Sequence, residues 1–350
     1  MGDLSEYNTL DSQTVELIYE HHKTTGDAQP QRGYLGGSII GRECERALWY
    51  TFRGCTRPEF SGRLYRLFET GHLEEIRMVR ELRAIGCEVH EEGEDGKQFG
   101  VSAFGGHFSG HMDGVALGIP EAPKTWHLLE FKTHNAKSFK ALQKSGMRGT
   151  KAEHWAQMQV YMGLGKLTRG LYIARNKDND ELYAERVRFD AGEFQRIMDK
   201  AQRIIEAAQP PERCTEKAED WRCRFCDHKA LCWGGEGVAV PIQARNCRTC
   251  IHATPETDSG KWTCAKHKKD LTRDQELAGC GYHLLIPGLV SFADPVDSSG
   301  IWVEYKNRHD GGHWKNSTAY GDPLDWTTVN LMTEEDGGPR ECPFKVEAAK

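Results

Sequence analysis

The sequence contains no run of apolar residues that approaches the roughly 20 needed for a membrane-spanning helix. Its first residues, MGDLSEYNTL, have neither a basic start nor an apolar stretch, so we expect no signal peptide. It has no excess of positive charge, because the net charge is −6 and the pI about 6.2. This balance argues against a protein that coats nucleic acid non-specifically. Internal repeats, low-complexity segments and a Walker phosphate-binding motif are also absent. We therefore expect a cytoplasmic protein that makes no contact with a membrane.

The chain has enough apolar mass for a hydrophobic core, with 38% hydrophobic and 28% charged residues in 350. Its length favours two or three domains. Hydrophobic periodicity predicts helices near 10–23, 38–52, 61–85, 135–147, 151–164 and 190–209. It predicts strands within 89–118 and near 126–132, 168–175 and 181–189. This alternation is typical of an α/β domain in which helices flank a small mixed central sheet.

Twelve cysteines are many for a chain kept in a reducing compartment, where they indicate metal binding more than disulfides. Three of them come early in the sequence: Cys44, Cys55 and Cys87. Eight crowd into a short region of loops: Cys214, Cys223, Cys226, Cys232, Cys247, Cys250, Cys264 and Cys280. The twelfth, Cys342, stands near the end of the sequence. The crowding predicts metal sites in the second half of the chain.

Two segments that each contain a carboxylate lie close together ahead of the crowded cysteine region. Asp113 stands in GHMDG, and Glu130 and Lys132 stand in LLEFKTH. Alternate residues of a strand share a face, so Glu130 and Lys132 should point the same way while Phe131 points into the core. Carboxylates on neighbouring strands suit Mg²⁺ or Mn²⁺, which prefer oxygen ligands. A Glu-x-Lys pair alone is more often part of an ordinary surface strand. The presence of Asp113 shortly before it is what favours a metal site.

The order Asp, gap, Glu-x-Lys resembles the PD-(D/E)XK nuclease superfamily. Its RecB-like and phage-exonuclease branch also has Gln-x-x-x-Tyr on the following helix, which Gln157 and Tyr161 match in QMQVY. The resemblance implies a restriction-endonuclease-like core and a bacterial or phage-infected cell as the setting. It also implies roles for particular residues: Asp113, Glu130 and Glu75 as metal ligands, Lys132 as the catalytic lysine, Gln157 orienting the site and Tyr161 near the DNA backbone.

The upstream helix offers two candidates for a further ligand. Gly71 and Glu75 match the branch's Gly-x-x-x-Glu motif, and Glu75 shares a helical face with apolar Met78 and Val79. A carboxylate on that face needs a partner, and a metal ion would serve. His72 departs from the spacing of the branch's histidine but stays a second candidate, and it could equally be an ordinary residue on the helix surface.

Basic residues follow the Glu-x-Lys segment and are placed to hold DNA phosphates. They are Lys137, Lys140, Lys144, Arg148 and Lys151. Each taken singly could equally belong to a solvated helix face. His154 and Trp155 could stack on a base, although core packing is the better interpretation for Trp155.

The run RCRFCDHKALC places three cysteines, Cys223, Cys226 and Cys232, in a C-x₂-C-x₅-C pattern that needs a fourth ligand. It resembles the iron-staple nucleases, the AddB-type subunits and CRISPR-associated RecB-like nucleases. In these the fourth cysteine precedes the nuclease motifs, a place that Cys44 occupies. The resemblance implies a [4Fe–4S] cluster. Zinc at the same ligands is the alternative, and Cys55 and Cys214 are rival fourth ligands.

A separate cysteine group predicts a structural zinc site, with a second iron site or no metal at all as the alternatives. It consists of Cys247, Cys250, Cys264 and Cys280. His252, His267 or His283 could replace the fourth ligand. The expected organisation is an N-terminal extension (1–34), a nuclease core with its iron–sulfur staple (35–235), a zinc module (240–290) and a β-rich or irregular extension (291–350).

These patterns favour a metal-dependent DNA exonuclease in recombination, repair or phage DNA processing. The expected partners are DNA and either a single-strand annealing protein or a helicase. A structure-selective endonuclease is the second hypothesis, and a catalytically idle DNA-binding or assembly module is the third. The presence of Asp113, Glu130 and Lys132 together argues against the idle module.

Overall fold

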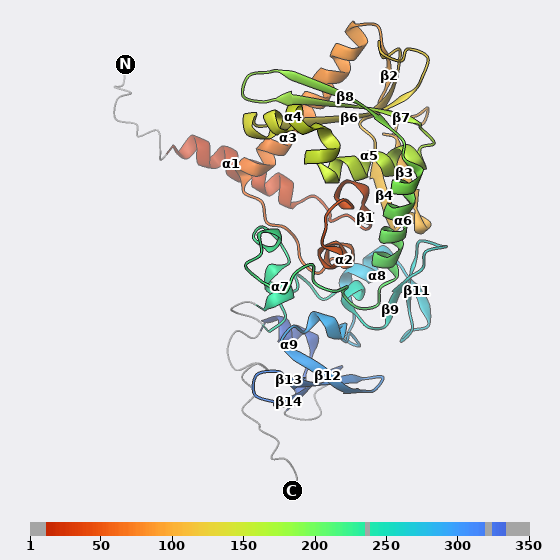
Figure 1. Cartoon of the computed structure of the whole chain (residues 1–350). Helices are drawn as coiled ribbons and strands as arrows, with labels where there is room; N and C mark the ends of the chain where they lie inside the picture. Colours follow the sequence, from red (N-terminus) through yellow and green to blue (C-terminus); the bar gives the residue numbers. More distant parts are fainter. Residues whose placement is uncertain (1–11, 235–238, 319–323, 334–350) are drawn as a thin grey trace. The chain divides into compact units, whose positions relative to one another are not determined.

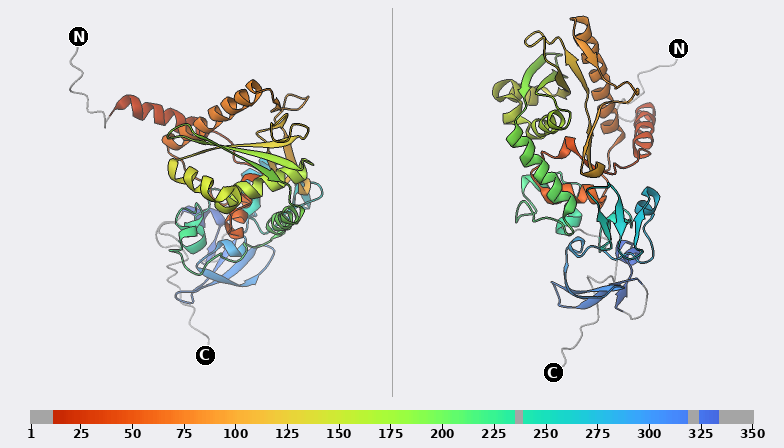
Figure 2. Two further views of the ribbon diagram at one scale, coloured as in Figure 1. Left: turned by 45° about the horizontal axis from the view of Figure 1, so that its top comes forward. Right: turned by 90° about the vertical axis from the view of Figure 1, so that its right-hand side faces the viewer.

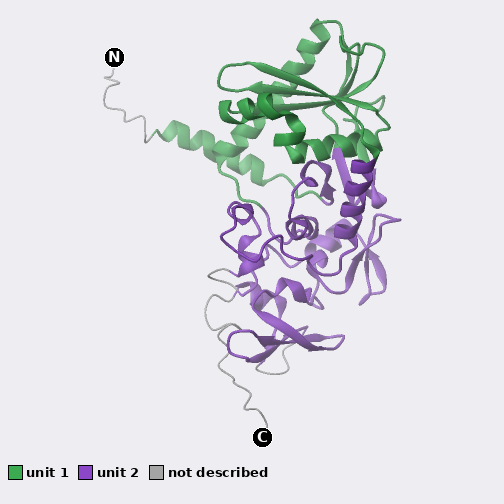
Figure 3. Cartoon of the chain, in the orientation of Figure 1, with its two compact units in different colours: residues 1–32, 58–101, 111–191 green, residues 33–57, 102–110, 192–350 purple. Residues whose placement is uncertain are grey.

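Figure 1 shows the computed structural model of the chain, which describes residues 12–234, 239–318 and 324–333. It divides into two compact units (Figure 3): unit 1 contains residues 1–32, 58–101 and 111–191, and unit 2 contains residues 33–57, 102–110 and 192–350. The predicted mixed α/β class is confirmed. No described helix is long and apolar enough to cross a membrane. The outer parts of both expected extensions, residues 1–11 and 334–350, lie outside the described residues.

Unit 1 contains a five-stranded mixed sheet in the order β2–β5–β6–β7–β8. Its strands are β2 (Glu88–His90), β5 (Gly114–Leu117), β6 (His127–His134), β7 (Arg169–Asn176) and β8 (Leu182–Arg188). The two long central strands, β6 and β7, run parallel, and the other neighbours are antiparallel. Both central strands are buried over most of their length, as expected for strands covered on two faces.

Helices cover both faces of this sheet (Figure 2). They are α3 (Gly62–Ala84), α4 (Ala136–Thr150) and α5 (Ala152–Leu164), while α1 (Gln13–Asp27) packs against α3. Helix α3 is N-capped by Ser61, whose side chain accepts a hydrogen bond from Leu64 N, and it buries Met78 and Val79 in one cluster with Phe131. On the opposite face α4 and α5 pack against β6 and β7. The polar face of β6 is therefore covered by α5.

Unit 2 is built from short elements. Its helices are α2 (Glu45–Arg53), α6 (Ala191–Glu206, from residue 192), α7 (Lys229–Trp233), α8 (Arg273–Ala278) and α9 (Thr328–Thr333). Its first strands, β1 (Leu35–Gly36) and β4 (Phe108–His111), pair in parallel, and β3 (Gly100–Ala103) spans the boundary between the units. A small antiparallel sheet contains β9 (Ala253–Pro255), β10 (Trp262–Cys264) and β11 (Lys269–Leu271).

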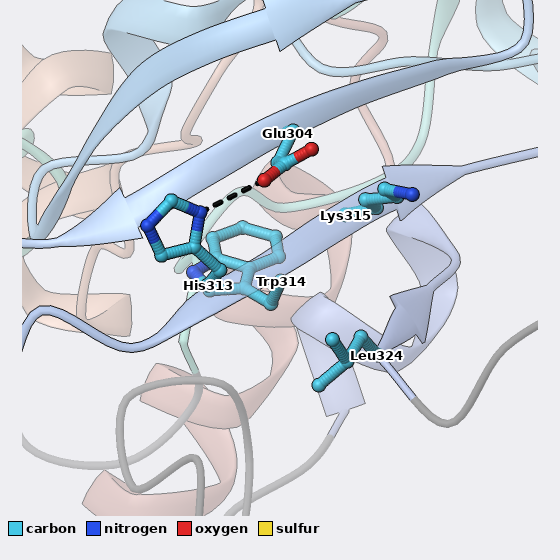
Figure 4. A pocket seen from close by; sticks show the side chains of 5 residues that line it. All are labelled: Glu304, His313, Trp314, Lys315 and Leu324. Carbon is cyan, nitrogen blue, oxygen red and sulfur yellow. Dashed lines mark hydrogen bonds and ion pairs between the residues drawn. The ribbon is translucent and has the colours of Figure 1, made fainter. Parts of the chain in front are cut away.

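The C-terminal part, where the sequence pattern indicated only irregular strand and loop, forms a four-stranded sheet. It consists of β12 (Ala293–Ser298), β13 (Trp302–Asn307), β14 (His313–Ser317) and β15 (Asp325–Trp326). Trp314 stacks on Tyr305 with ring centroids 4.5 Å apart and anchors the buried face. On this sheet Glu304, His313, Lys315 and Leu324 line a small pocket (Figure 4), in which His313 Nδ1 lies 2.8 Å from Glu304 Oε1.

Candidate functional site

Strand β6 places Glu130 and Lys132 on one face of the sheet, as the alternation of the strand predicts. Glu130 is fully buried, and its Oε1 forms an ion pair with Lys132 Nζ. Its Oε2 accepts a hydrogen bond of 2.8 Å from Gln157 Nε2 on α5. Phe131 points to the other face and packs in the core under α3. A buried carboxylate between a lysine and an amide is costly unless paired, and here both oxygens have a partner.

Asp113 is brought to the same strand by a turn that only glycine accommodates easily. Gly114 has φ +154°, and a Cβ there would stand 2.8 Å from the His90 carbonyl oxygen. The half-buried Asp113 accepts a hydrogen bond of 2.8 Å from the Phe131 backbone N–H through its Oδ2. Asp113 is thus held against the strand segment that carries Glu130 and Lys132.

Glu75 joins this group from α3, with one third of its side chain exposed and His72 Nδ1 3.5 Å from its Oε2. Burial raises the pKa of the Glu75 carboxyl, and the charge of Asp113 raises it further. Burial likewise raises the pKa of Glu130 to about 8, against the opposing charge of Lys132, while Asp113 and Glu75 add to the increase. The three carboxylates therefore repel one another, and a cation among them would relieve that repulsion.

The donor set fits a hard divalent cation. Glu75, Asp113 and Glu130 supply only oxygen, the ligand that Mg²⁺ and Mn²⁺ prefer. The buried Glu130 Oε1 has no hydrogen-bond donor besides its ion pair with Lys132, so it has capacity left for a cation. Within the described part of the chain, no three His, Cys, Asp or Glu side chains already converge on one metal position.

Helix α5 carries both residues of the Gln-x-x-x-Tyr motif, and the structure buries both. Gln157 contacts Glu130 directly, as described above. Tyr161 is 2% exposed and lies inside unit 1. Trp155 is half-buried, and the Arg148 guanidinium carbon stands 4.8 Å from its ring centroid.

The basic residues form an exposed stripe on α4. Lys137, Lys140 and Lys144 follow at spacings of three and four, which places them on one helix face opposite buried Phe139 and Leu142. No acidic residue occurs between Glu130 and Glu153, so this stretch is locally positive within an acidic chain. Arg148 is also exposed, whereas half-buried Lys151 donates a hydrogen bond of 2.7 Å to Ser138 Oγ.

A polar network that the sequence analysis missed lies beside Glu130. The Tyr172 hydroxyl is 2.9 Å from His134 Nε2 and 3.0 Å from His154 Nδ1, and Tyr172 is paired with Glu130 in the register of β6 and β7. Burial lowers the pKa of His134 to about 4 and that of His154 to about 3, so both stay neutral at physiological pH. Ser138 connects this network to Lys151. The sequence offered no periodic signal for it, because its members come from four separate elements.

The first cysteine group lies in unit 2. Cys44 is the N-cap of α2, so the expectation that it lies within a helix is wrong; the helix begins one residue later because Cys44 has extended dihedral angles (φ −81°, ψ 102°). Burial raises the pKa of Cys226, and Cys44, Cys223 and Cys232 add to the increase, so these four thiols interact. Cys214 interacts with them too, since burial and a hydrogen bond with Cys44 raise its pKa to about 12.

Buried side chains hold the two chain segments of this group together. Lys200 on α6 donates a hydrogen bond of 2.9 Å to the Ile40 carbonyl oxygen, in the loop that leads to Cys44. His228, between Cys226 and Cys232, contacts Thr51 Oγ1 through Nε2 at 3.0 Å and Thr56 Oγ1 through Nδ1 at 2.5 Å. These contacts bring the lone cysteine and the three-cysteine run into one neighbourhood.

The second cysteine group surrounds the small sheet of unit 2. Burial raises the pKa of Cys247 to about 12, and Cys250, Cys280 and Cys264 add to the increase. Cys280 Sγ lies 3.5 Å from His267 Nε2. His283, in contrast, is buried among Thr249, Thr328 and the Asn246 carbonyl, which occupy both its ring nitrogens.

Comparison with known proteins gives distant likenesses only. No family model matches the chain, and no curated protein matches it. Among solved structures, the protein SSO0001 is 14% identical with a TM-score of 0.36, covering 64% of this chain and 97% of its own. An alkaline exonuclease from Laribacter hongkongensis, LHK-Exo, is 16% identical with a TM-score of 0.36, covering 54% of this chain and 90% of its own. Its complex with dAMP has 17% identity, a TM-score of 0.37 and the same coverage.

Proposed function

We propose that unit 1 is a metal-dependent deoxyribonuclease that hydrolyses phosphodiester bonds from DNA ends, in recombination, repair or phage DNA processing. The observation that carries the proposal is the fully buried Glu130, held between Lys132 and Gln157 and electrostatically linked to Asp113 and Glu75. A structural role does not require three mutually repelling carboxylates around one lysine. Perturbed acids that share a charge partner are typical of catalytic sites.

Each side chain has a separate task in this mechanism. Asp113, Glu130 and Glu75 would hold Mg²⁺ or Mn²⁺, which when bound polarises the scissile phosphate and lowers the pKa of water. The Lys132 ammonium stabilises the negative charge that develops on the phosphate oxygens. Gln157 keeps the Glu130 carboxylate oriented through its hydrogen bond. The oxygen of water then bonds to phosphorus with loss of a proton to solvent, and the bond from phosphorus to the leaving sugar oxygen breaks as that oxygen takes up a proton from solvent.

The exposed stripe of Lys137, Lys140 and Lys144, with Arg148, would bind the DNA backbone. Lys151 is the weaker candidate, because its ammonium is already bonded to Ser138. Tyr161 would support the site from within α5. DNA is the expected substrate, and a single-strand annealing protein or a helicase is the expected protein partner.

Two metal centres in unit 2 complete the proposal. Cys44, Cys223, Cys226 and Cys232 would ligate a [4Fe–4S] cluster that staples the start of unit 2 to its α7 region, with Cys214 as the rival of Cys44. Cys247, Cys250, Cys264 and Cys280 would ligate a structural zinc ion, with His267 as the nearest substitute. In both groups the donors are soft thiols, which suit iron–sulfur clusters and zinc.

One experiment separates the candidate functions. The protein is incubated with end-labelled linear DNA and with covalently closed circular DNA, with and without Mg²⁺ or Mn²⁺. Metal-dependent loss of the linear substrate alone supports the exonuclease. Cleavage of circular or branched DNA would support the structure-selective endonuclease, and binding without cleavage would support an idle module.

A further inference from the structure

Two aromatic rings stand out on the surface of unit 2. Trp221 is 77% exposed and Phe225 is 86% exposed, the highest values among the large hydrophobic side chains of the described residues. They lie four residues apart in the segment that precedes α7, and Trp221 is the first residue of a 3-10 turn (Trp221–Cys223). Aromatic side chains of this size gain the most from burial, so two of them left in water on one loop indicate an interaction surface.

Hydrogen bonds and an ion pair hold the segment that carries the two rings. The Asp220 side chain accepts hydrogen bonds from the Arg222 backbone N–H and guanidinium, each 2.9 Å long, and Arg222 also pairs with Glu43. Main-chain hydrogen bonds join Cys223 N to Asp220 O at 2.9 Å and Arg224 N to Trp221 O at 3.3 Å. Because the backbone between the rings is fixed in this way, a ligand that binds them loses little loop entropy.

Charged side chains of both signs surround the rings, and one of the cations has no acidic partner among the described residues. Residues 219–229 contain three basic side chains, Arg222, Arg224 and Lys229, and three carboxylates, Glu219, Asp220 and Asp227. Arg222 is neutralised by its acidic partners, whereas the Arg224 guanidinium carbon lies 5.3 Å from the Phe225 ring centroid and has no acidic partner in the described part of the chain. A flat guanidinium over an exposed ring is an arrangement on which an unpaired base can stack.

We propose that Trp221, Arg224 and Phe225 form a binding surface for single-stranded DNA, on which bases stack and Arg224 contacts the backbone. A protein partner fits less well, because a stable protein interface buries roughly 1,200 Å² or more and two isolated rings on a loop offer far less. Duplex DNA fits less well too, because its bases already stack on one another. The surface belongs to unit 2 and does not depend on the chemistry proposed for unit 1.

The test measures binding by fluorescence anisotropy of a labelled 15-nucleotide dT oligomer and of a duplex of equal length. It uses the full chain with Asp113→Asn, so that the substrate survives. Trp221→Ala with Phe225→Ala should weaken binding of the oligomer at least tenfold, since each stacked base contributes strongly. Duplex binding should change less than threefold. The conservative pair Trp221→Phe and Phe225→Tyr should retain oligomer binding, as should the control Tyr282→Ala, which removes another exposed aromatic of unit 2.

Both substituted side chains are exposed, so loss of folding is not expected, and visible absorption and metal content report on the neighbouring cysteines. An alanine pair that binds the oligomer as tightly as the parent overturns the proposal. Unchanged DNA binding together with a change in oligomeric state assigns the rings to a protein contact and overturns it equally. If these rings bind the dT oligomer but the chain that retains Asp113 cleaves no DNA, the nuclease proposal is refuted and the binding proposal stands.

Discussion

Replacing Glu130 by glutamine should have opposite effects on activity and on stability. Glu130→Gln keeps the shape of the side chain but removes the charge that a divalent cation needs, so metal-dependent cleavage should fall at least about 100-fold. In the metal-free protein the same change removes a fully buried carboxylate that Asp113 and Glu75 repel. We therefore expect the metal-free variant to be more stable than the metal-free wild type at alkaline pH.

The pH dependence follows from the direction of the shift. Burial raises the pKa of the Glu130 carboxyl from 4.5 to about 8, so the folded chain holds this proton more tightly than the unfolded chain does. Its contribution to stability is complete below about pH 4.5 and is lost as the pH rises toward about 8. Each pKa unit is worth about 1.4 kcal/mol, which sets a ceiling of roughly 5 kcal/mol. Relaxation and water penetration reduce this ceiling, and we expect about 1–3 kcal/mol.

The assay is urea denaturation of both proteins without metal at pH 5 and at pH 9. The stability of Glu130→Gln relative to wild type should rise between the two pH values, while the exposed control Glu94→Gln should show no such change. Added Mg²⁺ should stabilise wild type at pH 8 and leave Glu130→Gln unchanged, because a ligand stabilises only the fold that binds it. A relative stability that is independent of pH, or a variant that Mg²⁺ stabilises as much as wild type, would refute the reasoning.

Three further predictions concern the other parts of the account. Glu75→Gln should reduce metal-dependent cleavage at least tenfold and Glu81→Gln, on the Arg77 face of the same helix, less than twofold; equal effects in a cleavage assay would remove Glu75 from the site. Cys44→Ser should remove the visible absorption of anaerobically purified protein and lower its thermal midpoint, while Cys55→Ser keeps the colour; a brown Cys44→Ser protein with full iron content would shift the ligand to Cys214. Cys250→Ser should lose about one zinc per chain, measured by metal analysis, and residues beyond about 240 should become sensitive to proteolysis. An unchanged zinc content would contradict the zinc site.

The sequence predicted the elements of unit 1 well because their signals are local. The alternation around Phe131 predicted that Glu130 and Lys132 share a face, and the helical phase of Glu75 placed Met78 and Val79 in the core. These inferences need only the repeat of one strand or one helix. The burial of Glu130, in contrast, could not be predicted from the sequence around it. It depends on α5 covering that face of β6, and no local pattern indicates such a contact.

Long-range contacts account for what the sequence analysis missed. Glu74 is next to Glu75 in the sequence, yet Arg175 on β7 pairs with it at 3.0 Å and its side chain is only 14% exposed, so the two neighbouring carboxylates have different partners. Tyr172 carries no motif of its own and becomes important only because β7 lies beside β6. Cys214 and Cys44 are far apart in the chain, and only the fold brings them into contact.

Metal-dependent phosphodiester hydrolysis by Asp113, Glu130 and Lys132 is the central proposal for unit 1. The direct measurement is the rate of nucleotide release from end-labelled linear DNA in Mg²⁺, for wild type, Asp113→Asn and Lys132→Ala, with DNA binding measured in parallel. We predict that both variants bind DNA like wild type and release nucleotides at least about 100-fold more slowly. Release within threefold of wild type by both variants would contradict the claim.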